Sequence, residues 1–516
     1  MNRPRKTLIF GLDGCDLEHA KRLADGGRLP WLKSRLDDGS LITTHCPVLP
    51  GSEWVNAACG VNPAHHGYLH TSQLRVGTYE SVETDARVVK AEPFYVPLAR
   101  AGNKTIVVDL CVDRPRPGVN LLQVIDWATE FKLFHYCTTP ASLRKFVDRT
   151  CPDHPMTDYP GTDPSEANLL RLNEKLNTGT AIKGRLIRHL MRENPDWAVF
   201  FAGFGEIHKG GHFFWQYQDA SHPQFGGNNH PLAGALDTLY ENTDQQMMQI
   251  CETAGPDTNV VVVADRGMRA NFRGDHLVET MLMKLGLLRY REESSRNGLN
   301  SETGPTATLD LSAQWQPPPA KSLAQHLKSR IPVPLRPLAR RLLGRERLDW
   351  RNTRVFTTAE VGNTYLRINL KGREPMGCVG RDEYDELLNH LEAEFLALVD
   401  PDTGRCPVRE VVFPHNSCSG PLRDELPDFG VVWASDGPIR ALESPNLGRI
   451  EGAHVEQRSG NHTERGGILL SGPDFRKGAH RSGDLRELAP TLLALHGVPP
   501  PAIYEFPAAG ELHKPC

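Results

Sequence analysis

Side chains of the types that bind metal ions follow three separated apolar runs of this chain. They are Asp13 after KTLIFGL, Glu206, His208 and His212 after WAVFFAGFG, and Asp265 and Arg266 after NVVVVA. In open α/β sheets, ligands bind in a crevice beyond the carboxyl ends of the strands, so residues that follow separate strands can meet there. The pattern predicts one metal-holding crevice built from distant parts of the sequence.

The two histidines of the second run are spaced as metal ligands often are. His208 and His212 are four residues apart and share one face of a helix, where a single ion can bind both imidazoles. His462, in GNHTERGG before a later apolar run, is the natural third ligand. Three neutral imidazoles with an open fourth position make a zinc site of catalytic type. The alternative is a set of surface or loop histidines. Glu206 faces elsewhere if it lies on the same helix, but if the helix begins later, Glu206 is either a ligand or an orienting residue.

The carboxylates and the serine each have two interpretations. Asp13 and Asp265 end strands, where a carboxylate either binds a metal or caps the next helix. Ser52 opens the short helical stretch SEWVNAACG, where the backbone N–H groups favour a phosphate. It is either a nucleophile activated by metal and amides or a helix cap.

Composition excludes several classes of protein. The net charge of −4 over 516 residues shows no excess of basic residues of the kind that nucleic-acid-binding proteins carry, so no nucleic-acid polymer is expected as a partner. The apolar run near the N-terminus is too short for a signal-peptide core or a membrane span. The cysteines are scattered and odd in number, without a C-x-x-C pair, which favours reduced thiols. We expect a cytoplasmic protein without a membrane span.

The elements that must position these side chains alternate between strands and helices. Apolar, β-branched runs predict strands at 7–12, 104–110, 120–125 and 259–263, and helical periodicity predicts helices at 16–25 and 30–39. This order predicts an α/β fold with a doubly wound, mostly parallel sheet flanked by helices.

Composition shifts predict four segments. They are a core domain over 1–290 with a helical insertion near 131–195, a Pro/Arg-rich segment over 291–355, a smaller inserted α+β cap over 356–450, and a return to the core over 451–516. The Pro/Arg-rich segment is either a solvated linker or a lid or membrane-surface contact.

The order of the motifs resembles a known group of enzymes. GLDG, PVLPGSEWVNAACGVNPAHHG, ADRGM, GNHTERGGILLSGPDF and LAPTLLALHGVPPP occur in the order found in the alkaline phosphatase superfamily. Within it the chain is most similar to the type I phosphodiesterase and nucleotide pyrophosphatase family. The resemblance covers most of residues 5–290 and 355–505.

The resemblance implies two metal ions, usually zinc, around a Thr or Ser nucleophile that forms a covalent phospho-enzyme. Asp13 and Asp265 match ligands of the ion that activates the nucleophile. His212 and His462 match ligands of the ion that serves the hydrolytic water.

The chain departs from the family pattern at three positions. Pro50, which has no hydroxyl, stands at the nucleophile position, and Ser52 is its nearest substitute. His208 replaces an aspartate, and Arg266 replaces a metal-binding histidine. The Arg266 guanidinium either takes over the positive charge of an ion and binds a phosphate oxygen, or marks a site that has lost one metal.

The resemblance therefore implies a metal-dependent phosphoester hydrolase, most similar to phosphodiesterases and nucleotide pyrophosphatases, acting on a small-molecule phosphate ester. One or two divalent ions are expected, Zn²⁺ first and Mn²⁺ second. One alternative keeps the fold but hydrolyses sulfate or phosphonate esters or transfers the phosphoryl group. Another is a non-catalytic descendant that binds a ligand at a degenerate site.

Overall fold

A mixed β-sheet forms the centre of the chain. The structure, a computed structural model, describes residues 4–46, 49, 51–128, 135–152, 164–291, 348–358, 364–434, 437–452 and 458–514. The nine described strands of the sheet run in the order β19 (His480–Gly483), β2 (Ser40–His45), β18 (Arg465–Ser471), β9 (Asn259–Ala264), β1 (Thr7–Leu12), β8 (Val199–Phe204), β5 (Thr105–Val108), β6 (Leu121–Ile125) and β7 (Cys137–Thr139). Strands β9, β1, β8, β5 and β6 are mutually parallel, and antiparallel pairings flank them.

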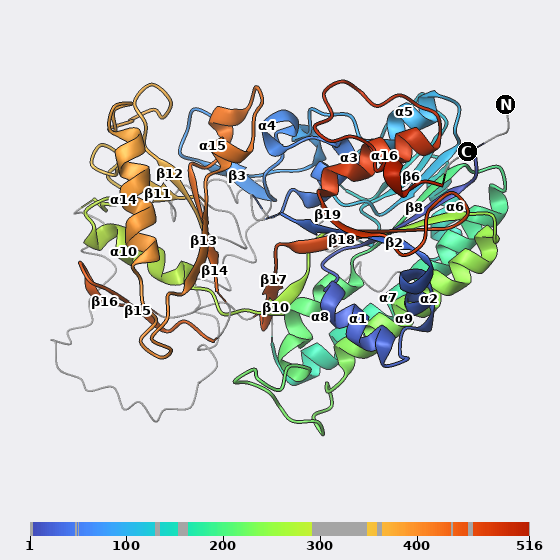
Figure 1. Ribbon diagram of the computed structural model, residues 1–516, viewed down its shortest axis with the longest axis horizontal. Coiled ribbons are helices and arrows are strands. Elements are labelled where there is room, and N and C mark those ends of the chain that lie inside the picture. Colours follow the sequence, from blue (N-terminus) through green and yellow to red (C-terminus); the bar gives the residue numbers. More distant parts are fainter. Residues whose placement is uncertain are drawn as a thin grey trace.

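Helices cover both faces of this sheet (Figure 1). One face carries α1 (Leu17–Asp25), α2 (Pro30–Asp38), α7 (Glu166–Glu193), α8 (Glu206–Phe214) and α9 (Ala235–Ala254), and the other carries α3 (Glu53–Cys59), α5 (Tyr95–Arg100) and α16 (Leu488–Leu495). Along β1, Leu8 and Phe10 pack into the first layer and Ile9 into the second. Burial on both faces explains why the central strands are continuous apolar runs. The prediction of a doubly wound, mostly parallel sheet is confirmed.

Strand register sets the position of the candidate site. Leu12 at the end of β1 lies beside Phe204 of β8 on one side and Ala264 of β9 on the other. The chain therefore leaves three adjacent strands at the same level, and Asp13 and Asp265 follow directly.

The region near 131–195 contains two described helices, α6 (Leu143–Thr150) and α7. Helix α7 packs along α9 within the layer that covers the sheet, and its side chains Leu172, Leu176 and Leu186 belong to the main core cluster. Residues 129–134 and 153–163 of the predicted insertion lie outside the described residues.

A second, smaller body stands beside the core (Figure 1). Its antiparallel sheet has the order β11 (Val355–Thr357), β12 (Thr364–Ile368), β14 (Phe429–Trp433) and β13 (Val408–Val412). Helices α10 (Val278–Lys284) and α14 (Tyr384–Leu396) and the hairpin of β15 (Ala441–Ser444) and β16 (Gly448–Glu451) share one apolar cluster with it. Residues 277–288, which precede the predicted boundary at 290, thus pack with this body. Most of the predicted linker or lid, 292–347, lies outside the described residues.

A short ribbon lies between the two bodies in Figure 1. It consists of β10 (Met268–Ala270) and β17 (Gly460–His462), which pair antiparallel. Among the described helices, none combines the length and the hydropathy that a membrane crossing requires.

Candidate metal centre

Three histidines from two distant parts of the chain meet at the carboxyl end of the sheet. Helix α8 begins directly after β8, so His208 and His212 face the same direction from its first turns. Pairing of β10 with β17 places His462 opposite Met268 and brings it to the same point. The Nε2 atom of His208 lies 3.0 Å from Nε2 of His212 and 3.0 Å from Nε2 of His462.

The outer nitrogens of two of these rings are held by acceptors. His212 Nδ1 donates to the carbonyl oxygen of Gly460 at 2.8 Å, and His208 Nδ1 lies 2.8 Å from Asp13 Oδ2. Because a carbonyl oxygen can only accept, the proton of His212 is on Nδ1 and its Nε2 presents a lone pair. Metal-binding histidines are oriented by this kind of partner.

The arrangement fits a divalent ion. Imidazole lone pairs that face each other at 3.0 Å repel unless a proton or a cation lies between them, and one proton can serve only one pair. In tetrahedral zinc sites, nitrogens about 2.0 Å from the ion are about 3.3 Å apart, which is close to the observed spacing. Within the described part of the chain, these histidines form the one group of three or more metal-type side chains whose ligand atoms lie within 4.8 Å of one another.

The electrostatics of the centre favour the neutral form of His212 and His462, which is the form that binds metals. Burial lowers the pKa of His212 well below its usual value, and the charge of Arg458 lowers it further. The pKa of His462 is lowered in the same way by burial and then by the Arg266 charge. Both rings are therefore ready to bind a cation without first losing a proton.

Asp13 lies on the outer side of the His208 ring, away from the point where the three Nε2 atoms meet. Its other oxygen, Oδ1, accepts the indole N–H of Trp54 at 3.1 Å. Burial raises the pKa of Asp13, but His208 and Arg266 outweigh this effect and hold the pKa well below its usual range. The carboxylate is thus ionised and placed to orient His208.

Asp265 and Arg266 form a second group beside the first. Asp265 Oδ1 accepts the backbone N–H of Gly14 at 2.8 Å, and its Oδ2 lies 3.5 Å from Nε of Arg266. Arg266 Nη1 is 3.6 Å from Oε1 of Glu53. Burial raises the pKa of Asp265, as does the Asp13 charge. Burial lowers the pKa of Arg266, but Glu53 and Asp265 raise it above its ordinary value, so the guanidinium stays charged.

Glu206 does not join the histidines. Its oxygens lie 3.0 and 3.3 Å from Nζ of Lys183 on α7, and that ammonium is 3.4 Å from Asp109 Oδ2. All three side chains are buried. Because Glu206 is the first residue of α8, this ion pair fixes the start of the helix that carries two of the histidines. The sequence offered no signal for it, since nothing links Lys183 to Glu206 before α7 is placed.

Ser52 precedes α3 at the cap position but makes no capping hydrogen bond with its side chain. Its hydroxyl is fully buried, donates to the carbonyl oxygen of Leu49 at 3.0 Å and accepts from Asn56 Nδ2 at 3.2 Å. Ser52 is not among the residues that line the adjacent pocket, whereas Gly51 is. Pro50 lies outside the described residues.

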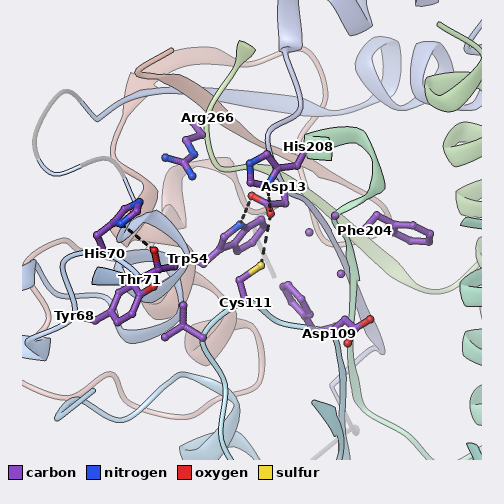
Figure 2. Close-up of a pocket in the computed structure, with 16 residues that line it drawn as sticks. Asp13, Trp54, Tyr68, His70, Thr71, Asp109, Cys111, Phe204, His208 and Arg266 are labelled. Atoms are coloured by element: carbon purple, nitrogen blue, oxygen red, sulfur yellow. Dashed lines mark hydrogen bonds and ion pairs between the residues drawn. The ribbon is translucent and has the colours of Figure 1, made fainter. Parts of the chain in front are cut away.

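A pocket opens beside Asp13, His208 and Arg266 (Figure 2). Its other walls include the aromatic side chains of Trp54, Tyr68, Phe201 and Phe204, together with His70, Thr71, Asp109 and Cys111. Figure 2 shows His70 and Thr71 on the side opposite Phe204, joined by a contact of 3.1 Å between His70 Nδ1 and Thr71 Oγ1. Trp54 lies on α3 and Phe201 and Phe204 lie on β8, whereas sequence reasoning missed Tyr68, His70 and Thr71 because they lie in a loop without a recognisable motif.

Solved structures with the same fold include two hydrolases. Phosphonoacetate hydrolase from Sinorhizobium meliloti 1021, in complex with phosphonoformate, is 14% identical with a TM-score of 0.50, and the match covers 99% of this chain and 93% of that one. Murine ectonucleotide pyrophosphatase/phosphodiesterase 5 is 11% identical with a TM-score of 0.50, over 99% of this chain and 100% of that one. At these identities the two structures show the fold.

Family membership follows from the sequence itself. Residues 7–328 match the model of the family described as type I phosphodiesterase / nucleotide pyrophosphatase. This match covers more than half of the chain and confirms the resemblance inferred from the motifs. The chain therefore belongs to the type I phosphodiesterase and nucleotide pyrophosphatase family of metal-dependent phosphoester hydrolases.

Proposed function

We propose that this hydrolase acts on small-molecule phosphate esters with a single divalent ion, Zn²⁺ in the first place, held by His208, His212 and His462. The observation that carries the proposal is the meeting of three Nε2 atoms: that of His208 lies 3.0 Å from each of the other two, while Asp13 and Gly460 hold the outer nitrogens of His208 and His212. Zinc accepts three imidazoles and an open fourth position, and Mn²⁺ is the second choice. The ion supplies Lewis acidity that withdraws charge from a phosphoryl oxygen.

Arg266 supplies positive charge where family members hold a second ion. Its guanidinium lines the pocket beside Asp13 and His208 and is held between Glu53 and Asp265. A guanidinium binds phosphate oxygens through a planar pair of N–H groups, which stabilises the charge that develops in the transition state. Asp13 acts through His208 as an orienting residue in this proposal.

The hydrogen bonds of the Ser52 hydroxyl support a structural role for this residue. Sequence position makes it the nearest substitute for the family nucleophile, but in the folded chain its donor and its acceptor are engaged by Leu49 and Asn56. A nucleophilic hydroxyl needs a base within reach and a path to the phosphorus atom. We therefore propose that Ser52 supports the loop around Gly51.

The substrate class follows the family, with a phosphodiester or nucleotide-like ester as the first choice. The test is a comparison of bis(4-nitrophenyl) phosphate, 4-nitrophenyl phosphate, 4-nitrophenyl phenylphosphonate and 4-nitrophenyl sulfate, with metal content measured on the same preparation. We expect about one ion per chain and phosphodiester hydrolysis that a chelator abolishes and zinc restores.

A matched pair of variants makes this test specific to the proposed site. His462→Gln should lose the ion and the activity, whereas His480→Gln, on an exposed position of β19, should keep both. A protein that hydrolyses the diester equally well without metal would overturn the proposal. A protein that holds no ion and hydrolyses none of the four esters would favour the ligand-binding alternative.

We also propose a cytoplasmic location. The cysteines that the structure describes are free thiols, several of them buried, as expected for a reducing compartment. Fractionation of cells that produce the chain from its own gene tests this assignment; recovery in the extracellular fraction would contradict it.

A further inference from the structure

A second arginine reaches the histidine cluster from a different element. Arg458 lies two residues before the ribbon strand β17, and its Nη1 atom lies 3.3 Å from Nε2 of His212, one of the three nitrogens that face the centre. A side chain within hydrogen-bond distance of a ligand atom is also within reach of a group bound to the ion. Neither its position in the sequence nor the family motifs single out Arg458.

The backbone that carries Arg458 is tied down on two sides. Its carbonyl oxygen accepts from Asn271 Nδ2 at 3.0 Å, next to the end of β10. The backbone N–H of Asn271 donates to the carbonyl oxygen of the following residue, Ser459, at 2.9 Å. The Ser459 hydroxyl donates to the carbonyl oxygen of His212 at 3.4 Å. The guanidinium is therefore presented from a segment that is fixed to the same helix as His212.

The two arginines flank the cluster from different directions. Arg458 contacts Nε2 of His212 at 3.3 Å, whereas Arg266 lines the pocket beside Asp13 and His208 (Figure 2). Arg266 comes from the loop after β9, where Glu53 and Asp265 hold it. An ion held by the three histidines would thus have one guanidinium beside His212 and another in the pocket beside His208.

Positive groups this close together repel one another, and an anion placed between them is attracted by both. A phosphoryl group suits this position because its oxygens can bind an ion on one side and accept two N–H groups of a guanidinium on the other. We infer that Arg458 is a substrate-binding residue. It binds the phosphoryl group together with the ion at the three histidines, so that the ion and the phosphoryl group bind cooperatively. The inference rests on the proposed single-ion centre.

Cooperativity can be measured without turnover. Co²⁺ is titrated into the metal-free full-length chain, with and without saturating methylphosphonate, and its visible absorption reports binding at nitrogen ligands. Thermodynamic coupling between two sites is typically 5- to 150-fold, and we expect methylphosphonate to tighten Co²⁺ binding about tenfold or more. By reciprocity, Co²⁺ should tighten methylphosphonate binding by the same factor.

Variants of Arg458 test whether this residue causes the coupling between Co²⁺ binding and methylphosphonate binding. In Arg458→Gln the enhancement by methylphosphonate should fall to about twofold or less, while Co²⁺ alone binds at least as tightly as in the parent, because a nearby positive charge has gone. Arg458→Met, which keeps the apolar stem, is the second variant if the glutamine variant does not fold. Arg465→Gln, at an exposed position of β18, is the matched control and should keep the full coupling.

The outcomes separate the inference from the proposal on which it rests. Co²⁺ binding with an enhancement that survives both Arg458 variants would overturn the role of Arg458 and leave the metal centre intact. Co²⁺ binding without enhancement in the parent chain would do the same. A parent chain that binds no Co²⁺ at the histidines would overturn both.

Discussion

Replacing Asp13 by asparagine should weaken zinc binding about 10- to 100-fold and leave the number of bound ions unchanged. Asp13 Oδ2 accepts from Nδ1 of His208 at 2.8 Å, and a hydrogen bond to a charged group contributes about 1.5–3 kcal/mol. Since about 1.4 kcal/mol corresponds to a tenfold change in affinity, the loss falls in this range. Asparagine cannot repeat both contacts, because when its oxygen faces His208 its amide N–H₂ faces the indole N–H of Trp54.

Zinc affinity and stoichiometry of Asp13→Asn are measured by calorimetric titration of the metal-free protein, followed by elemental analysis. Asp38→Asn is the control, because Asp38 is an exposed carboxylate that pairs with Lys477 far from the histidines. An affinity equal to that of the parent would refute the orienting role. A fall from two ions to one would show that Asp13 is instead a ligand of a second ion, as the family resemblance implies.

Three further substitutions test the centre and its support. His212→Ala should abolish both bound zinc and the rise in melting temperature that zinc causes, as followed by calorimetry; retained zinc would exclude His212 as a ligand. Ser52→Ala should cost about 1–3 kcal/mol in urea unfolding, because the hydroxyl bond to Leu49 is buried, and should keep turnover; a folded but inactive variant would restore Ser52 as nucleophile. Burial lowers the pKa of His66, which bonds Asn56 at 2.7 Å, to about 3. As pH falls below about 6.5 the unfolded chain takes up a proton at this position and the folded chain does not, so the stability advantage of the parent over His66→Gln should shrink by about 2 kcal/mol between pH 7.5 and pH 5. An advantage that is the same at both pH values would contradict the low pKa.

Individual strands and helices of the core could be predicted because short stretches of sequence specify them. The strands β1 and β9 are apolar runs of the length and composition that buried parallel strands require, and the helix α2 begins at Pro30 and ends before Gly39, as its sequence indicates. The packing of α7 along α9 was not predictable, because the polar sequence around 131–195 shows where a helix forms but not which face of the sheet the helix covers.

The site, like the packing of the helices, depends on contacts between distant residues that local sequence patterns do not specify. The i, i+4 spacing places His208 and His212 on one helix face, but the meeting with His462 depends on the pairing of β10 with β17, which no local pattern specifies. Motif order supplied that information through the family resemblance. The contacts of Asp13 with His208 and of Glu206 with Lys183 join residues 195 and 23 positions apart, and both appear only once the chain has folded.

The departures at His208 and Arg266 are coupled through Asp13 and Asp265. His208 takes the carboxylate of Asp13 at 2.8 Å, and Arg266 lies against Asp265 at 3.5 Å, so each replacement occupies an aspartate that the resemblance assigns to a second ion. Arg266→His alone should therefore leave about one zinc per chain, because Asp13 stays with His208. Arg266→His combined with His208→Asp frees both aspartates and should raise the content toward two. Elemental analysis of the two folded variants decides the matter. A second ion in the single variant would show that Asp13 is not committed to His208, and its absence from the double variant would show that freeing the two aspartates is not sufficient to bind a second ion.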